Sequence, residues 1–395
     1  MKILFLTHRL PYPPDRGDRI RSYHILSHLA RRHQIALASV AEEAAEQQHI
    51  NVLKKLCMSV DIACLNNRWQ KIKSLFYFPT LTPLTLPFFY IKILQQKIDC
   101  LLHQQKFDLI FIYCSAMAPY VLKIKHIPKV IDFVDADSEK WFDYAHYSQL
   151  PMKFIYWREG LLLRRYEKQI AQNCRHAFVV SQREAEIFKE FLPAIPITTI
   201  PNGVTVPKLN RNSEGTYKLV FTGVMDYWPN VDAVTYFVKE IFPIVRNQVP
   251  QAEFIIVGKN PTPQVKHLAK ERGIKVTGWV PDVREYLAQA SVCVVPLRIA
   301  RGIQNKILEA MAARVPVVAT SAATAGIEAV PGRDFLLADE PRQFAGHVIA
   351  LLLSREKRRQ LADNAFKFIR QRHNWEKNLE KMEKILISSA SNGSR

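Results

Sequence analysis

Residues 301–312 combine the residue types that bind a ligand carrying phosphates. The apolar run Ser291–Pro296 predicts a buried strand just before them, and Gly302 would let the backbone approach a ligand closely. The predicted helix that follows begins near Gln304, Asn305 and Lys306. Its first backbone N–H groups and its dipole favour an anion, and Lys306 adds a full positive charge. The candidate substrate-binding residues in this turn are Gly302, Ile303, Gln304 and Asn305.

Glu309 lies three residues after Lys306, on roughly the same face of the predicted helix. A carboxylate beside a phosphate is unfavourable unless it binds hydroxyl groups instead, and the two adjacent hydroxyls of a ribose would suit it. The alternative is an ion pair between Lys306 and Glu309 on the helix surface, which is worth only about 0.3–0.5 kcal/mol. The spacing alone leaves both interpretations open.

Three other glycine-containing loops follow predicted strands in the second half of the chain. They begin at Gly223, Gly258 and Gly278. The carboxyl ends of parallel strands share one edge of a sheet, and ligands bind at that edge. One such loop is weak support, because strand-to-helix turns often contain glycine. Their recurrence favours a ligand site that includes Gly223.

An acidic run, residues 132–139, ends a predicted strand in the first half of this basic chain. One of its carboxylates is a candidate general base for an acceptor hydroxyl, and we assign that role to Asp135. Alternatively, Asp135 or Asp137 caps the helix that follows. A run of aspartates without further ligands is poor support for a divalent metal, so we expect no metal site.

Gly17 is a second candidate substrate-binding residue in this half. It stands in a proline-rich loop between a predicted strand and a predicted helix, with Arg16 and Arg19 beside it. These two arginines would meet a phosphate of the substrate, or they are solvated surface charges.

The elements that would position these residues alternate between strand and helix. The strands predicted in the first half are Lys2–Thr7, Gln34–Ala41, Phe107–Tyr113, Val130–Val134 and His176–Ser181. Those in the second half are Lys218–Gly223, Phe254–Gly258, Lys275–Gly278, Ser291–Pro296 and Val315–Thr320. Helices fall between them, the first over residues 19–32. This alternation predicts an α/β fold with a doubly wound parallel sheet in each half.

A polar segment rich in proline and asparagine, residues 195–215, interrupts the alternation. We therefore predict an N-terminal, acceptor-side domain over residues 1–200 and a C-terminal, donor-binding domain over residues 201–365. A charged helical segment over residues 366–395 would pack back towards the N-terminal domain. Two α/β domains of this kind suit the joining of two substrates.

The composition narrows the choice of partners. The formal net charge of +19 requires a partner or a surface of opposite sign, and an anionic small substrate, an anionic membrane or a nucleic acid would provide it. No known nucleic-acid-binding pattern occurs, so we expect no nucleic acid. The six cysteines are scattered without a CxxC pair, which fits a reduced compartment.

Residues 74–91 form an uncharged stretch rich in Phe, Tyr and Leu, flanked by lysines. Prolines at positions 79, 83 and 87 would break a membrane-spanning helix repeatedly. The stretch is either an interfacial segment that enters a bilayer surface or a buried helix-and-loop region. Residues 151–158 have the same basic and aromatic character, which favours contact with an anionic membrane.

Several of these motifs resemble those of the retaining glycosyltransferases of family 4. The N-terminal loop with Gly17 is similar to their glycine loop, and residues 200–204 are similar to their interdomain signature. Residues 305–312 are similar to the second part of their paired-glutamate motif, where the second glutamate binds the donor ribose. That role would fall to Glu309. The resemblance implies a GT-B fold, in which two Rossmann-like domains face each other across a cleft.

The first glutamate of that motif should lie eight residues before Glu309, where this chain has Arg301. An arginine there would contact phosphate, so we expect Arg301 and Lys306 to stabilise the charge that develops on the leaving diphosphate. A histidine that often precedes the aspartate of the N-terminal domain is replaced by Val134, and only Asp135 carries over.

More narrowly, residues 132–141, 225–233 and 301–306 resemble sugar transferases associated with PEP-CTERM/exosortase systems of bacterial exopolysaccharide clusters. The resemblance implies a hexosyltransferase-type enzyme that needs no cofactor or metal. It would use a nucleotide-sugar donor and a glycan or lipid-linked acceptor in the cytoplasm, on the inner face of the cytoplasmic membrane. The alternatives are a nucleotide-sugar epimerase or hydrolase of the same fold, and a non-catalytic basic protein that binds membrane or nucleic acid.

Overall fold

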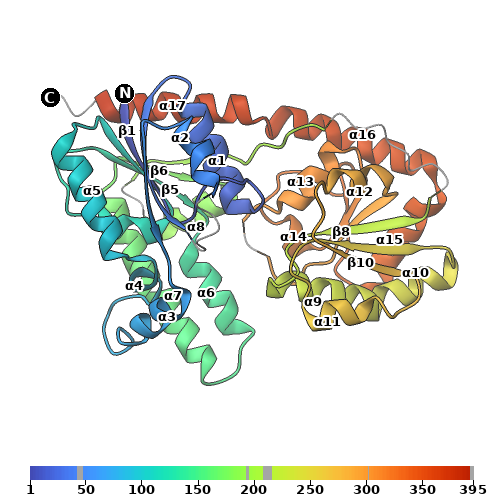
Figure 1. The fold of residues 1–395 in the computed structure, drawn as a ribbon. Coiled ribbons are helices and arrows are strands. Elements are labelled where there is room, and N and C mark those ends of the chain that lie inside the picture. Colours follow the sequence, from blue (N-terminus) through green and yellow to red (C-terminus); the bar gives the residue numbers. More distant parts are fainter. Residues whose placement is uncertain (42–47, 193–194, 208–215, 301, 392–395) are drawn as a thin grey trace. The chain divides into compact units, whose positions relative to one another are not determined.

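The computed structural model describes residues 1–41, 48–192, 195–207, 216–300 and 302–391 (Figure 1). The chain divides into two compact units. Unit 1 comprises Met1–Ile200 together with Glu376–Arg395, and unit 2 comprises Pro201–Trp375. We expected the C-terminal segment to leave the second domain at residue 366, whereas residues 366–375 stay with unit 2.

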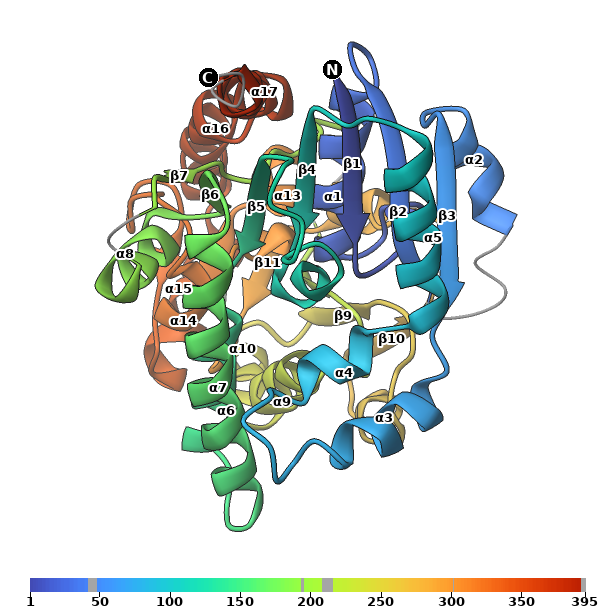
Figure 2. The same ribbon diagram turned by 90° about the vertical axis from the view of Figure 1, so that its left-hand side faces the viewer.

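Unit 1 is built on a seven-stranded parallel sheet with the strand order β3-β2-β1-β4-β5-β6-β7. Its strands are β1 (Lys2–Thr7), β2 (Gln34–Ala41), β3 (Ser59–Cys64), β4 (Leu109–Tyr113), β5 (Lys129–Val134), β6 (His176–Val179) and β7 (Ile197–Thr199). Its helices are α1 (Gly17–Leu29), α2 (Ile50–Lys54), α3 (Asn67–Leu75), α4 (Thr85–Phe89), α5 (Lys92–Gln104), the 3-10 helix Ser115–Tyr120, α6 (Asp137–His146), α7 (Met152–Gln172), α8 (Gln182–Phe191) and most of α17 (Trp375–Ser391). Figure 2 shows α5 in front of this sheet and α1 behind it.

Unit 2 is built on a six-stranded parallel sheet with the strand order β10-β9-β8-β11-β12-β13. Its strands are β8 (Lys218–Thr222), β9 (Glu253–Val257), β10 (Ile274–Gly278), β11 (Val292–Val295), β12 (Val317–Ala319) and β13 (Leu336–Leu337). Its helices are α9 (Trp228–Tyr236), the π-helix Phe237–Ile241, α10 (Phe242–Gln248), α11 (Pro263–Leu268), α12 (Arg284–Gln289), α13 (Asn305–Ala312), α14 (Ser321–Thr324), α15 (Pro341–Leu353) and α16 (Arg355–Arg372).

The central strands form because their apolar runs are covered on both faces. All of β4 is buried, as are all but the first residue of β1 and all of β11. The doubly wound parallel sheets that we expected are therefore confirmed, and β1 and β2 have the predicted bounds. The strands β3, β7 and β13 were not predicted, because they lie at or near sheet edges and are short or only partly buried.

Helix α17 is joined to unit 1 by a buried carboxylate. Glu383 accepts hydrogen bonds from His28 Nε2 at 2.8 Å, His33 Nε2 at 3.0 Å and Arg32 Nη1 at 3.1 Å. Its side chain is only 5% exposed. Burial alone would raise the pKa of Glu383, but the bond from His28 and the nearby charges outweigh burial and lower it. The ionised carboxylate therefore links the last helix to α1.

Candidate functional site

The loops predicted to bind phosphate meet at the switch point of the unit 2 sheet. Strand β8 lies between β9 and β11, so the chain leaves β8 towards one side of the sheet and later returns on the other side at β11. The loops that follow β8 and β11 therefore open next to each other at the carboxyl edge. Ligands of open α/β sheets bind in the crevice formed at such a point.

Two glycines allow the loops after β8 and β9 to pack backbone against backbone. A Cβ atom at Gly258 would lie 1.6 Å from the carbonyl oxygen of Gly223, closer than any side chain permits. The N–H of Met225 donates to the carbonyl of Lys259 at 2.8 Å and fixes the same contact. A Cβ atom at Gly223 would lie 3.2 Å from Lys306 Nζ. Gly223 thus leaves room for the ammonium group.

Lys306 reaches from α13 to the loop after β8. Its Nζ donates to Asn230 Oδ1 at 2.7 Å and lies 3.9 Å from the centroid of the Phe221 ring. Asn230 in turn donates from Nδ2 to the carbonyl of Val224 at 2.9 Å. Burial lowers the pKa of Lys306 to about 7. An arriving anion would favour the charged form again, so this amine is suited to respond to a bound phosphate.

Glu309 lies one turn further along α13. Burial raises its pKa to about 7, although the positive charge of Lys306 acts in the opposite direction. The polar partner of Lys306 is Asn230, and no ion pair between Lys306 and Glu309 occurs within the described residues. The surface ion pair considered as an alternative is therefore wrong, because the Lys306 ammonium group donates to Asn230 instead. Glu309 remains available to accept hydrogen bonds from a ligand.

The turn before α13 has the backbone shape expected of a close approach. Gly302 adopts φ 62°, in the left-handed region that favours glycine, and a Cβ atom at Gly326 would lie 2.6 Å from the Gly302 carbonyl oxygen. Gln304 precedes the first residue of α13, and Ile303 packs against the core of unit 2. Ile303 therefore supports the turn through its side chain. Arg301 lies outside the described residues.

The segment that opens unit 2 braces α13. Asn202 donates from Nδ2 to Asn305 Oδ1 at 3.1 Å, and the Asn202 carbonyl accepts a 2.6 Å hydrogen bond from His373 Nδ1. A Cβ atom at Gly203 would lie 2.5 Å from the backbone nitrogen of Trp375. Asn202 thus orients Asn305 at the helix start, and Gly203 allows the chain to pass close to Trp375.

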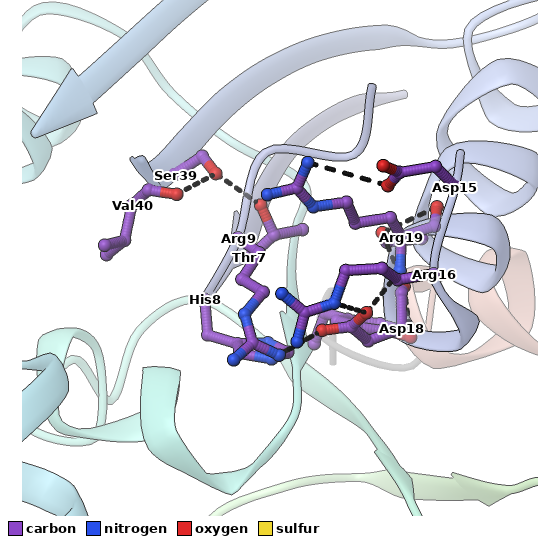
Figure 3. A network of polar contacts seen from close by, with 11 residues as sticks. Thr7, His8, Arg9, Asp15, Arg16, Asp18, Arg19, Ser39 and Val40 are labelled. Atoms are coloured by element: carbon purple, nitrogen blue, oxygen red, sulfur yellow. Dashed lines mark hydrogen bonds and ion pairs between the residues drawn. The ribbon is translucent and has the colours of Figure 1, made fainter. Parts of the chain in front are cut away.

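Unit 1 has an analogous switch point between β1 and β4, where Gly17 opens α1. Charged side chains surround Asp18 beside it (Figure 3). Arg9 donates to Asp18, Arg16 Nε lies 3.8 Å from its carboxylate, and His8 Nε2 lies 3.5 Å away. Burial alone would raise the pKa of Asp18, but the bond from His8 and the two arginines hold it well below its usual range. Arg16 therefore belongs to an internal charge network.

Asp135 follows β5 and is partly exposed. The residue before it, Val134, has φ 70°, which is strained for a β-branched side chain. Asp132 Oδ1 accepts from the N–H of Val134 at 3.0 Å, while Arg21 Nε donates to Asp132 Oδ2 at 2.7 Å. Both Arg21 and Asp132 are buried, so this pair holds the strained turn that presents Asp135.

Helix α6 after this turn is capped by distant glutamates. Glu184 accepts from the N–H of Ala136 at 2.8 Å, and Glu167 accepts from the N–H of Ser138 at 3.1 Å. Asp137 instead accepts a hydrogen bond from the hydroxyl of Ser115. The residue at the N-cap position is Ala136, so the expectation that Asp135 or Asp137 caps this helix is wrong.

The structure thus brings together Gly223, Lys306 and Glu309, and sets Gly302, Gln304 and Asn305 in the turn before them. The sequence did not identify Asn230 and Asn202, although both lie in motifs singled out for other reasons. In the described ranges, no three His, Cys, Asp or Glu side chains gather as a metal-binding group, and no helix is long and apolar enough to cross a membrane.

Both units match models of glycosyltransferase families. Residues 19–206 match glycosyltransferase family 4, and residues 216–354 match glycosyl transferases group 1. A comparison with curated proteins gave no match.

Solved glycosyltransferase structures share the fold over almost the whole chain. HepE from Anabaena, solved in complex with UDP, is 18% identical with a TM-score of 0.68, over 98% of this chain and 100% of HepE. Sucrose-phosphate synthase from Thermosynechococcus elongatus is 15% identical with a TM-score of 0.71, over 98% of each chain. A variant of S. aureus TarM is 12% identical with a TM-score of 0.68, over 98% of this chain and 99% of TarM.

The fold is therefore GT-B, with two Rossmann-like α/β units. Because family matches cover both units as well, the chain belongs to the GT-B glycosyltransferases and is an enzyme of that type.

Proposed function

We propose that this glycosyltransferase binds a nucleoside-diphosphate sugar at the β8–β11 switch point of unit 2, with UDP-glucose as the first donor to test. The observation that carries the proposal is the position of Lys306, which is partly buried beside Gly223 and bonded to Asn230. Relatives of the same fold support the choice of nucleotide, since HepE was solved with UDP and with UDP-glucose.

Lys306 would stabilise the diphosphate as the glycosidic bond breaks. Negative charge grows on the leaving group in that step, and a fixed ammonium in a site shielded from water lowers the energy of the transition state. The N-terminus of α13 would act in the same direction through its backbone N–H groups. Arg301 is proposed as a second cation, and Glu309 as the acceptor of hydrogen bonds from the ribose hydroxyls. We propose that these groups perform the transfer without a metal.

The acceptor would bind to unit 1. Asp135 is proposed to take the proton of the acceptor hydroxyl, and the Gly17 loop to hold the rest of the acceptor. We further propose that the acceptor is a glycan, carried on a lipid, in bacterial exopolysaccharide synthesis of the PEP-CTERM/exosortase-associated kind. Transfer would retain the anomeric configuration and take place at the cytoplasmic face of the membrane. The acceptor, the pathway and the retention of configuration are proposed from the motif resemblance.

The test is a donor screen followed by a transfer assay. Thermal unfolding in the presence of UDP, GDP and ADP would identify the nucleotide, because a ligand bound at 100 times its Kd adds about 2.7 kcal/mol of stability. The matching labelled sugar nucleotide is then incubated with and without lipid-linked glycan. Label in the glycan supports the proposal. Equally fast release or epimerisation of the sugar without acceptor would identify a hydrolase or epimerase instead, and stabilisation by no nucleotide would refute donor binding.

A further inference from the structure

Helix α3 exposes large apolar side chains next to the basic residues Arg68 and Lys71, which are exposed as well. The exposed fractions are 69% for Trp69, 50% for Ile72, 65% for Leu75 and 76% for Phe76. Ser74 is buried instead, and Lys73 lies against unit 1, where its Nζ donates to the Tyr90 carbonyl at 2.8 Å. A surface helix of a globular protein normally turns its large apolar side chains towards the core. Its exposed face therefore requires an apolar environment that unit 1 does not supply.

The first part of α7 is fastened to the segment that follows α3. Arg158 Nη2 lies 3.4 Å from the Tyr77 carbonyl oxygen, and the guanidinium group lies 4.9 Å from the centroid of the Phe78 ring. Glu159 accepts hydrogen bonds from the N–H groups of Leu84 and Thr85, both at 2.8 Å. In both ribbon views α3 and the α6–α7 turn lie towards the same end of unit 1 (Figures 1 and 2). The two segments therefore form one rigid part of the surface.

The start of α7 carries a second group of exposed apolar side chains. Their exposed fractions are 77% for Leu150, 40% for Met152, 52% for Phe154 and 49% for Trp157. In the segment after α3, Leu81 is 82% exposed. Single exposed apolar residues are ordinary, but a group of this size from two connected segments marks an interaction site.

The two stretches of sequence that carry these side chains contain basic residues but no acidic ones. The sequence contains no aspartate or glutamate between Asp61 and Asp99, and none from position 144 to 158. The basic residues within these two stretches are Arg68, Lys71, Lys73, Lys92, Lys97, Lys153 and Arg158. Aromatic rings beside lysine and arginine are the combination found at the depth of lipid headgroups.

We propose that Trp69, Ile72, Leu75, Phe76, Leu81, Leu150, Phe154 and Trp157 form a docking surface by which unit 1 binds an anionic lipid bilayer. The apolar side chains enter the interface, and the surrounding lysines and arginines bind lipid phosphates. A bilayer fits better than a protein partner, because the exposed aromatic and aliphatic side chains are accompanied by the exposed basic residues Arg68, Lys71 and Lys153. The proposal deepens the lipid-linked acceptor and rests on that proposed function for its biological purpose, but it is tested independently.

The test uses the full-length protein and vesicles of phosphatidylcholine with and without phosphatidylglycerol. The wild type is expected to sediment with anionic vesicles, and roughly tenfold less with neutral ones. The double variant Phe76→Ser/Trp157→Ser should bind anionic vesicles at least about tenfold more weakly, because two large apolar side chains no longer enter the interface. Leu353→Ser is the matched control, since Leu353 is 64% exposed in unit 2, and it should bind like the wild type.

Insertion is checked by tryptophan fluorescence with brominated lipids. Quenching is expected in the wild type and should fall in Trp69→Phe/Trp157→Phe, whereas circular dichroism and UDP binding should stay unchanged in every variant. Equal vesicle binding by the double variant, or binding of a DNA oligonucleotide in place of vesicles, would overturn the docking surface. Vesicle binding without any sugar transfer would leave the docking surface standing and refute the proposed function instead. Sugar transfer to a water-soluble acceptor without vesicle binding would support the proposed function and refute the docking surface.

Discussion

The switch points of the two units have the same topology but different chemistry. In unit 2, glycine backbones pack against each other and leave space around one partly buried amine, Lys306, whose partner Asn230 is neutral. In unit 1, the charges around Asp18 are engaged with one another, and a buried ion pair of Arg21 and Asp132 supports the nearby turn. Unit 2 therefore has an amine whose protonation an anionic ligand can favour, whereas the charged groups of unit 1 are paired with one another.

The largest effect is expected from the buried pair of unit 1. Arg21→Met would leave the Asp132 carboxylate buried without its cation, which costs about 3–5 kcal/mol in the free energy of unfolding. Urea denaturation measures this loss, and UDP affinity should not change while unit 2 is folded. Arg284→Met is the control, since Arg284 is 58% exposed and its pair with Asp282 is worth about 0.2–1 kcal/mol. Equal losses in the two variants would refute the structural role of the Arg21–Asp132 pair.

The next effect concerns catalysis in unit 2. Lys306→Met is expected to lower kcat by about 10²–10³, the usual result of removing one group that stabilises transition-state charge. Steady-state transfer from the sugar nucleotide measures it, and Lys266→Met on the exposed face of α11 should stay within about twofold of the wild type. If kcat is unchanged and only KM rises, Lys306 binds the donor without assisting bond breaking.

The glycine contact of unit 2 should be sensitive to a single methyl group. Gly258→Ala would place a Cβ atom 1.6 Å from the Gly223 carbonyl and push the two loops apart, with a loss of about 1–3 kcal/mol and weaker UDP binding. Gly346→Ala has no heavy atom within 4 Å of its new Cβ and lies inside α15, so it should add about 0.5–1 kcal/mol. Thermal unfolding with and without UDP compares them. A stable Gly258→Ala variant with normal affinity would contradict the close backbone packing.

The smallest effect is a change in pH dependence. With a Glu309 pKa of about 7, acid protonates the carboxylate, and UDP affinity of the wild type should fall as the pH drops below 7. Glu309→Gln should bind UDP about tenfold more weakly at pH 7.5, the loss expected for one charged hydrogen bond, and should lack the acid-side decline. Titration at pH 5.5 to 7.5 decides this. If the UDP affinity of Glu309→Gln falls below pH 7 as it does in the wild type, Glu309 is not the titrating group.

The sequence predicted the sheets well because their central strands are continuous apolar runs covered on both faces. It also predicted the helix start near Asn305, since the glycine and the polar residues there are local signals. Edge strand β3 was missed, because it is partly exposed and contains Asp61. A strand can be predicted from its sequence when all of its residues are buried, because it is then a continuous apolar run. A strand at a sheet edge, where only some residues are buried, lacks this signal.

The contacts that complete the two sites could not be predicted from spacing. Lys306 and Asn230 are 76 residues apart, and Arg21 and Asp132 are 111 residues apart. Their pairing depends on the strand order, which brings β8 beside β11 and β1 beside β4. The cap of α6 was misassigned for the same reason, since Glu167 lies on a later helix.

Proton uptake on UDP binding tests the central claim most directly. At pH 8 a Lys306 amine with a pKa of about 7 is mostly neutral, and the diphosphate should restore its proton. Calorimetric titrations in buffers of different ionisation enthalpy should therefore show uptake of close to one proton per UDP by the wild type and almost none by Lys306→Met. UDP binding without proton uptake by the wild type, or with equal uptake by the variant, would contradict a diphosphate site at Lys306.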